Sequence, residues 1–348
     1  MPLANSAVTV SRLALYLVSG AFVSLCAAAC GGSGSSASKG SPTDPSPTPS
    51  NTWSISGSVV DTGAHKGVSN ASVKPSWNMP PVSTDANGGY SFSASGNPPP
   101  SPNKVSLSAS GFVNREQWIT IQSQRSDVTL DLIRNSAPFS MEFYRQLARG
   151  TFDEADGPYP LQRWEQQPKF YLQTVDQIGR AVPPEVLNTI RDAVSRAVPA
   201  WTGGQYTAVL ESGKEGRPGV PGWINITVQN SPGERVTCGQ SYVGADPGDI
   251  QLIMNPVCSC GPIKVPGQVV VHEVGHALGF FHVADNKSVM YPEAPGNCPV
   301  GELSASESYH SAIAYQRPRG NEDPDNDPTM SKSFFARPVR GRPGPIIN

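Results

Sequence analysis

The sequence of 348 residues has no long run of one charge sign and no apolar stretch of membrane-spanning length. Its 26 basic and 28 acidic residues give a formal charge of -2 without a basic footprint, so we predict no nucleic-acid partner. The main apolar stretch, residues 13–25, is shorter than the roughly 20 residues that a transmembrane helix needs. Glycine and proline are plentiful instead, at 34 and 35 residues, which predicts many turns, short strands and few long helices.

The first 29 residues have the order of an export signal. Arg12 precedes the apolar stretch, and three alanines at 27–29 lead to Cys30. This order resembles a bacterial lipoprotein signal, which implies that Cys30 becomes the lipidated first residue of the mature protein and attaches it to a bacterial membrane. The alternative is ordinary cleavage after Ala29 with a soluble secreted product. Both interpretations predict an exported protein, either a cell-envelope lipoprotein or a secreted one.

The next two segments differ sharply in composition. Residues 30–52 are rich in Gly, Ser, Pro and Thr, so they are expected to form a flexible linker. Residues 53–135 alternate apolar and polar side chains in short segments between turns, which predicts an all-β sandwich. The segments ISGSVVD, GVSNASV, TDANGGYSF and VSLSASGF resemble carboxypeptidase regulatory-like modules, which are transthyretin-like sandwiches. We expect Trp53, Trp77 and Trp118 to be core residues rather than a ligand platform.

A mixed α/β pattern follows and makes the predicted protein multidomain. Strands are expected at 169–175, 223–228 and 249–254. A helix is expected from Pro183 to Pro199, because its apolar residues recur at helical spacing. This second domain is predicted to span residues 136–320. Residues 321–348 are rich in Pro, Asp, Arg and Gly and are predicted to form a partly disordered tail.

The residues HEVGHALGFFH, beginning at His272, match the pattern H-E-x-x-H-x-x-G-x-x-H. His272 and His276 are four residues apart, so on a helix they present two imidazoles to one metal ion, with Glu273 beside them to reach a bound water. Gly279 can take the positive φ that ends the helix, which lets His282 supply a third nitrogen. Three histidines leave the fourth tetrahedral position of Zn²⁺ for water, the arrangement of a catalytic zinc.

Met290 stands eight residues after His282, inside Ser-Val-Met-Tyr-Pro. Together with the histidine pattern it resembles the metzincin zinc peptidases, in which a methionine turn lies beneath the metal. Its spacing, and Asp285 three residues after His282, are most similar to the matrixin branch. The resemblance implies an α/β metzincin catalytic domain, one catalytic Zn²⁺ ion and a protein or peptide substrate.

Two usual features of matrixins are missing from this chain. Upstream of His272 the only histidine is His65, in the other domain, so a second, structural zinc is not predicted. No cysteine lies between Cys30 and Cys238 to act as a propeptide ligand of the zinc. Calcium ions are possible in the family, but no residue pattern here specifies a calcium site.

The predicted function is that of a zinc-dependent endopeptidase acting outside the cytoplasm. By resemblance, Glu273 is the general base for a zinc-activated water. The substrate would lie extended and pair with an edge strand, for which residues 249–255 are our candidate. One alternative is a non-catalytic cell-surface binding or adhesion lipoprotein, and another is a structural protein whose sandwich binds a surface polymer. The presence of Glu273 and all three histidines favours the enzyme.

Four cysteines follow the signal: Cys238, Cys258, Cys260 and Cys298. An even number in an exported protein predicts disulfides. Cys258 and Cys260 are too close together to pair comfortably, so each should bond to Cys238 or Cys298, in either order. The alternative, a cysteine-rich zinc site, is disfavoured because thiols tend to oxidise after export.

The signal pattern leads to a test of membrane attachment. We predict that wild-type protein fractionates with the membrane and that Cys30→Ser releases it, because the substitution removes the thiol that carries the lipid. Cell fractionation followed by immunodetection measures the distribution. A wild-type protein that is already soluble, or a variant that stays on the membrane, would contradict the prediction.

Overall fold

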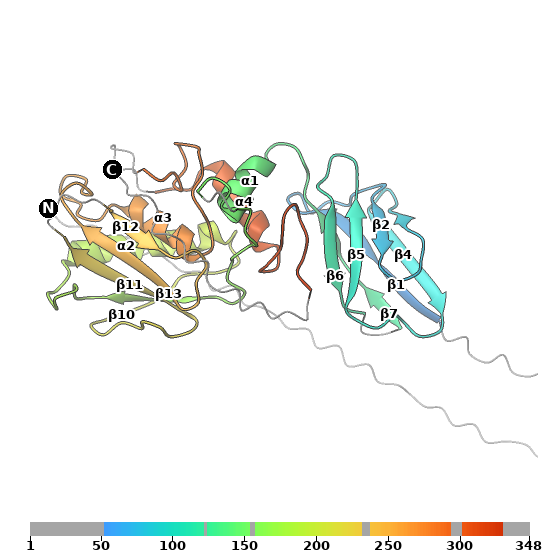
Figure 1. The fold of residues 1–348 in the computed structure, drawn as a ribbon, viewed down its shortest axis with the longest axis horizontal. Helices are drawn as coiled ribbons and strands as arrows, with labels where there is room; N and C mark the ends of the chain where they lie inside the picture. The colour runs from blue at the N-terminus through green and yellow to red at the C-terminus, as the bar shows by residue number, and fades with distance from the viewer. Residues whose placement is uncertain (1–51, 122–123, 154–156, 232–236, 294–300, 330–348) are drawn as a thin grey trace, which may run out of the picture. The chain divides into compact units, whose positions relative to one another are not determined.

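The structure is a computed structural model that describes residues 52–121, 124–153, 157–231, 237–293 and 301–329 (Figure 1). The predicted signal peptide, Cys30, the predicted linker up to residue 51, Cys298 and the chain after residue 329 lie outside these ranges. The described residues belong to one compact unit, Ser50–Asn348. Within them, no helix has the length and hydropathy required to cross a bilayer.

The described chain is mixed α/β, with several sheets and four helices. The first part, which we name the N-terminal β region, runs from Thr52 to Arg134. Its strands are β1 (Thr52–Asp61), β2 (Ser72–Pro75), β3 (Val82–Ser83), β4 (Gly89–Ser95), β5 (Asn103–Ser108), β6 (Arg115–Ile119), β7 (Arg125–Asp127) and β8 (Leu130–Leu132).

These strands form two sheets. In one, β1 pairs antiparallel with β4 and parallel with β7 and β8; in the other the order is β3-β2-β5-β6. Residues from both sheets, including Ile55 and Leu107, share one hydrophobic core. Trp53 belongs to this core and Trp77 packs against it, as expected. Trp118 is only half-buried and lies outside it, because the neighbouring Ile119 takes the inward position on β6.

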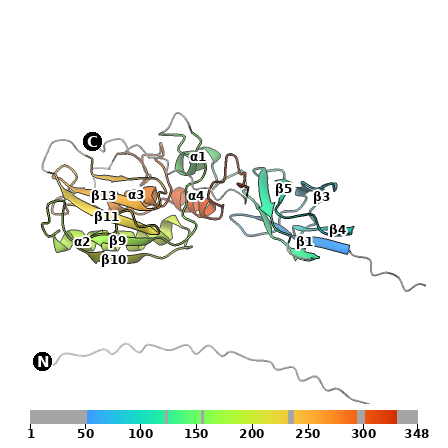
Figure 2. The same ribbon diagram turned by 60° about the horizontal axis from the view of Figure 1, so that its bottom comes forward.

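The second part holds the remaining elements. These are α1 (Met141–Arg149), β9 (Lys169–Gln173), α2 (Pro184–Trp201), β10 (Val209–Gly213), β11 (Trp223–Asn230), β12 (Gly239–Ser241), β13 (Gly248–Met254), α3 (Gly267–Ala277) and α4 (Ala305–Tyr315). Five strands form one sheet in the order β10-β9-β11-β13-β12, and β12 alone is antiparallel to its neighbour. The succession β10, β9, β11, β13 can be followed in Figure 2.

The strand alternation decides which side of this sheet is buried. Ile224, Ile226 and Val228 of β11 point into one core, as the sequence predicts, and share it with Phe170 and Leu172 of β9. Helices α2 and α3 contact each other and contribute to the same core, and α3 also contacts β12 and β13. The sheet therefore supports α3 along its length.

The edge of the sheet differs from our expectation. We predicted that residues 249–255 form the edge strand, and this is wrong, because β13 pairs with β11 on one side and β12 on the other. The edge strand on this side of the sheet is β12, which has only three residues. Its sequence, Gly-Gln-Ser, has no apolar alternation from which a strand could be predicted.

Helix α2 also extends further than predicted. It continues through Pro199 and ends at Trp201. A proline near the end of a helix removes a single backbone donor. The last turn is stabilised by Trp201, which is fully buried and donates its indole N–H to the Val271 carbonyl of α3 at 3.0 Å.

The start of the predicted tail is packed. Asn321 and Asp325 are buried, and Asn326 forms a parallel bridge with Glu116 of β6. Hydrogen bonds and ion pairs to these residues compensate the burial of polar groups, so the packed chain continues beyond the predicted boundary at residue 320.

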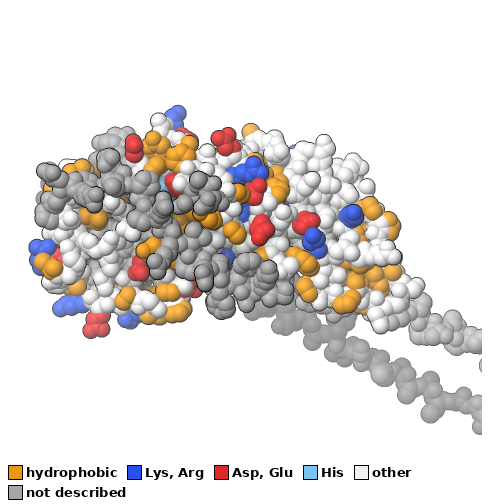
Figure 3. Space-filling view, in the orientation of Figure 1, with side chains coloured by type: hydrophobic (Ala, Val, Ile, Leu, Met, Phe, Trp, Pro, Cys, Tyr) orange, Lys and Arg blue, Asp and Glu red, His pale blue; other side chains and the backbone are white. Residues whose placement is uncertain are grey.

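The surface carries both signs of charge. On the face in Figure 3, Lys and Arg side chains are interspersed with Asp and Glu side chains, and most of the remaining surface is uncharged. Among the described residues, this face has no broad basic patch.

Candidate metal centre

Helix α3 carries His272, Glu273 and His276. Every residue from Gln268 to Ala277 is buried, so the site is built on a helix with packing on all sides. The helix ends at Ala277, and Gly279 follows with φ +111°. A Cβ atom there would lie 2.9 Å from the carbonyl carbon of Gln162, so both the backbone angle and the space require glycine.

The turn at Gly279 brings His282 back beside the helix. The Nε2 atom of His272 lies 3.0 Å from Nε2 of His276 and 3.1 Å from Nε2 of His282, and the third distance is also 3.1 Å. All three histidines are buried. They form a cluster of three ligand atoms, which we name the histidine triad.

Each triad imidazole is oriented by an acceptor at its other nitrogen. His272 Nδ1 donates to the Val289 carbonyl at 2.7 Å, and His276 Nδ1 donates to the Phe280 carbonyl at 2.8 Å. A carbonyl only accepts hydrogen bonds, so Nδ1 carries the proton and Nε2 presents its lone pair to the centre. His282 Nδ1 contacts the carboxylate of Asp153, with 2.9 Å to Oδ2.

The protonation state of the triad suits metal binding. Burial lowers the pKa of His272 to about 3 and holds the pKa of His276 well below its ordinary value. Both are therefore neutral at physiological pH, which is the form that binds a metal.

The donor set fits zinc. Zn–N bonds of about 2.0–2.1 Å in tetrahedral geometry hold neighbouring nitrogens about 3.3 Å apart. The observed separations of 3.0–3.1 Å are close to this value. Imidazoles with acceptors at Nδ1 are ligands of the kind that zinc prefers.

Glu273 lies next to the triad but is not part of it. Its carboxyl group is buried, and burial raises its pKa to about 8. Oε2 has no hydrogen-bond partner within the described part of the chain. A buried polar oxygen without a partner is costly, so this atom is suited to accept a hydrogen bond from a water molecule or a substrate.

The edge strand contacts this carboxylate directly. A Cβ atom on Gly239 of β12 would lie 2.4 Å from Glu273 Oε1 and 2.6 Å from its Cγ. Only glycine lets the carboxylate lie against the backbone of β12. Gly239 could not be predicted from the sequence, because an isolated glycine does not indicate which side chain packs against it.

Met290 packs beneath the helix. A Cβ atom on Gly275, which lies between the two helical histidines, would be 2.7 Å from Met290 Sδ and 3.0 Å from the Trp201 ring. Glu307 fixes the turn by accepting from Met290 N at 3.1 Å, while its other oxygen accepts from Ser304 N at 2.7 Å in the capping box of α4.

Asp153 is the second residue that the sequence analysis missed. Besides its contact with His282 Nδ1, it accepts from the backbone N–H of His282 at 3.1 Å. It lies 129 residues before His282, so no local pattern could join them. Carboxylate partners of this kind orient a ligand and make it more basic.

None of the described cysteines belongs to the ligand cluster of the triad. Cys238 and Cys258 form a disulfide, which ties the residue before β12 to the loop after β13. Cys260 is also disulfide-bonded. Its pairing with Cys298 stays a prediction, because Cys298 lies outside the described residues.

Comparisons with known proteins agree with this site over a short span. The family model of the matrixins matches residues 266–307, which include the triad, Met290 and the start of α4. Among curated proteins, none matches the chain. The match and the histidine triad together support a matrixin-like zinc metallopeptidase.

Two solved structures show weak similarity. One is a cohesin–X-dockerin complex from Acetivibrio cellulolyticus, with 11% identity and a TM-score of 0.20 over 25% of this chain and 62% of that chain. The other is a putative membrane-associated protein of unknown function from Bacteroides fragilis, with 16% identity and a TM-score of 0.20 over 25% of this chain and 29% of that chain. Similarities of this strength do not identify the fold.

The position of Asp153 generates the first test of the site. Asp153→Ala should weaken zinc binding about 10- to 100-fold, because His282 loses both contacts that orient it. Chelator competition on the purified protein measures the affinity, with Asp192→Ala, an exposed position on α2, as the control. Equal zinc affinity in the variant and the wild type would contradict this role.

The contact at Gly239 generates the second test. Gly239→Ala should displace the Glu273 carboxylate while leaving the triad in place, so hydrolysis should fall about tenfold or more with zinc content unchanged. Gly248→Ala is the matched control, because its Cβ would crowd Ile224 in the same sheet at 2.9 Å, away from Glu273. If both variants lose activity equally, crowding of the sheet explains the loss.

Proposed function

We propose that this protein is a zinc-dependent endopeptidase of the metzincin class, matrixin branch, acting on proteins outside the cytoplasm. The convergence of three imidazoles beside the Glu273 carboxyl group, whose Oε2 has no partner among the described residues, carries the proposal. A structural zinc site would need a fourth protein ligand. Within the described residues, the metal-ligand cluster contains only the three histidines.

The triad would hold the metal, and Glu273 would transfer the proton. Zinc held by His272, His276 and His282 would polarise the scissile carbonyl and lower the pKa of a bound water. In its ionised form Glu273 would accept a proton from that water and return it to the leaving amine, and a pKa of about 8 favours both transfers near neutral pH. Its burial excludes competing solvent, and Gly239 keeps it against β12.

The substrate is a protein or peptide in extended conformation. The edge strand β12 has one partner, β13, and lies directly against Glu273, so a peptide that pairs with β12 passes beside the carboxylate. A hollow of about 440 Å³ lies next to this strand, and its lining residues include Gln240, Tyr242 and Gln251. Alternate side chains of a paired peptide point to opposite faces, so some of them would face this hollow.

We also propose that the protein is exported and that it has two domains. The signal pattern supports export and lipid attachment at Cys30. The shared core of the two N-terminal sheets supports a β-sandwich over residues 53–135, followed by the catalytic domain from residue 136. A non-catalytic binding lipoprotein is the competing function.

The full mature chain provides the test. The wild type should bind about one zinc ion and cleave unstructured polypeptides. Glu273→Ala should keep the metal and lose activity about a hundredfold to ten-thousandfold, because it removes only the proton acceptor. Zinc content and peptide hydrolysis are measured on the same samples.

His276→Ala is the comparison variant. It should lose zinc affinity as well as activity, because two histidines no longer define the site. A wild type that binds zinc but cleaves nothing in a diverse peptide library would contradict the protease and favour the binding function.

A further inference from the structure

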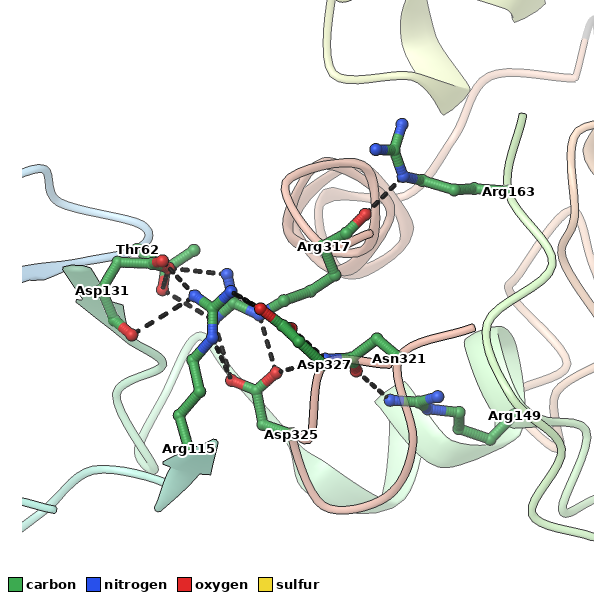
Figure 4. A network of polar contacts seen from close by, with 9 residues as sticks. All are labelled: Thr62, Arg115, Asp131, Arg149, Arg163, Arg317, Asn321, Asp325 and Asp327. Carbon is green, nitrogen blue, oxygen red and sulfur yellow. Dashed lines mark hydrogen bonds and ion pairs between the residues drawn. The ribbon is translucent and has the colours of Figure 1, made fainter. Parts of the chain in front are cut away.

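A network of buried charges joins the N-terminal β region to the C-terminal segment, residues 317–327 (Figure 4). Arg317 is fully buried and donates to Asp325 through Nε at 2.8 Å and Nη2 at 2.9 Å. Its Nη1 donates to Asp131 of β8 at 2.6 Å. Arg115 of β6 also contacts Asp131 and pairs with Asp327 at 2.9 Å.

The backbone reinforces this contact. Glu116 N of β6 donates to the Asp325 carbonyl at 3.1 Å, and Asp327 N donates to the Glu116 carbonyl at 2.8 Å. The C-terminal segment therefore adds a short stretch of backbone pairing to the edge of the second N-terminal sheet. Side-chain and backbone contacts together fix its position.

The same segment holds helix α1. Asn321 donates to Asp325 at 3.0 Å and to Asp327 at 2.8 Å, and its oxygen accepts from Arg149 at the end of α1. Arg145, one turn earlier, forms a bidentate pair with Asp323, with both distances at 2.8 Å. Helix α1 is thus fastened to the C-terminal segment at two successive turns.

Helix α1 in turn holds the segment that carries His282. Phe281 N donates to the Leu147 carbonyl at 2.8 Å, and Ala284 N donates to Gln146 Oε1 at 3.0 Å. Asp153, four residues after the end of α1, binds both the backbone and the ring of His282. The third triad residue is therefore supported on both sides by α1 and the loop after it.

We propose that the N-terminal β region positions His282, with Arg115 as the positioning residue that acts through the C-terminal segment and α1. The inference rests on the proposed zinc site but not on proteolysis. His272 and His276 lie on α3 and are held by α2, β12 and β13, so they do not need this support. His282 lies outside that helix and depends on the chain of contacts from β6 to Asp153.

Disrupting the network should therefore lower the affinity of the triad for zinc. Arg115 is 3% exposed, and removing its charge leaves Asp131 and Asp327 without one of their partners. A partly buried carboxylate that loses a cationic partner is destabilised, which favours rearrangement of the groups around it. The C-terminal segment and α1 would shift, and His282 would lose its orientation.

The experiment uses the full mature chain and zinc alone. Arg115→Met should weaken zinc affinity about tenfold or more, as expected for loss of the support behind a ligand. Lys104→Met is the matched control, because it removes an exposed ion pair with Glu116 on the same sheet. Its zinc affinity should equal that of the wild type.

A double-mutant cycle distinguishes positioning from general loss of stability. If Arg115 acts through Asp153, then Arg115→Met should add little to the loss of zinc affinity caused by Asp153→Ala. Asp327→Asn provides a milder change if Arg115→Met does not fold, as judged by circular dichroism, and should weaken zinc affinity in the same direction.

The results distinguish the positioning role of Arg115 from the proposed protease function. Folded network variants with wild-type zinc affinity, or full additivity in the cycle, would overturn the positioning role even in an active protease. A protein that cleaves no peptide but loses zinc affinity on Arg115→Met keeps the positioning role and overturns the protease.

Discussion

The site depends on the hydrogen bonds at the three Nδ1 atoms of the triad. They fix the tautomers and turn three Nε2 lone pairs toward one point, while burial lowers the pKa of His272 and His276. The acceptors come from three segments: the turn that contains Met290, the loop after α3, and the loop after α1. The rest of the fold brings these segments together around α3.

The features that could be predicted from the sequence are those that depend on residues close together in the chain. The spacing of His272 and His276 and the glycine at 279 predicted the geometry of the triad, because helical periodicity and positive φ are properties of neighbouring residues. The alternation in β11 predicted its buried face for the same reason.

Other features could not be predicted, because they depend on contacts between distant residues. Asp153 and His282 are 129 positions apart, and Arg115 and Asp327 are 212 apart. The edge strand β12 is defined by its single partner rather than by its composition. A composition rich in Pro, Asp, Arg and Gly suggested a tail after residue 320, whereas Asp325 is buried against Arg317 and Asp327 pairs with Arg115 of the N-terminal β region. Composition indicates how polar a segment is on average. It does not indicate which distant residues pair with its charged side chains.

The central claim is that the triad binds a catalytic zinc. X-ray absorption spectroscopy of the zinc-loaded full chain tests it directly, because scattering from imidazole and from sulfur is distinct. The account predicts three imidazole nitrogens and one light oxygen ligand at about 2.0–2.1 Å. A zinc bound through cysteine sulfur, or by fewer than three imidazoles, would contradict it.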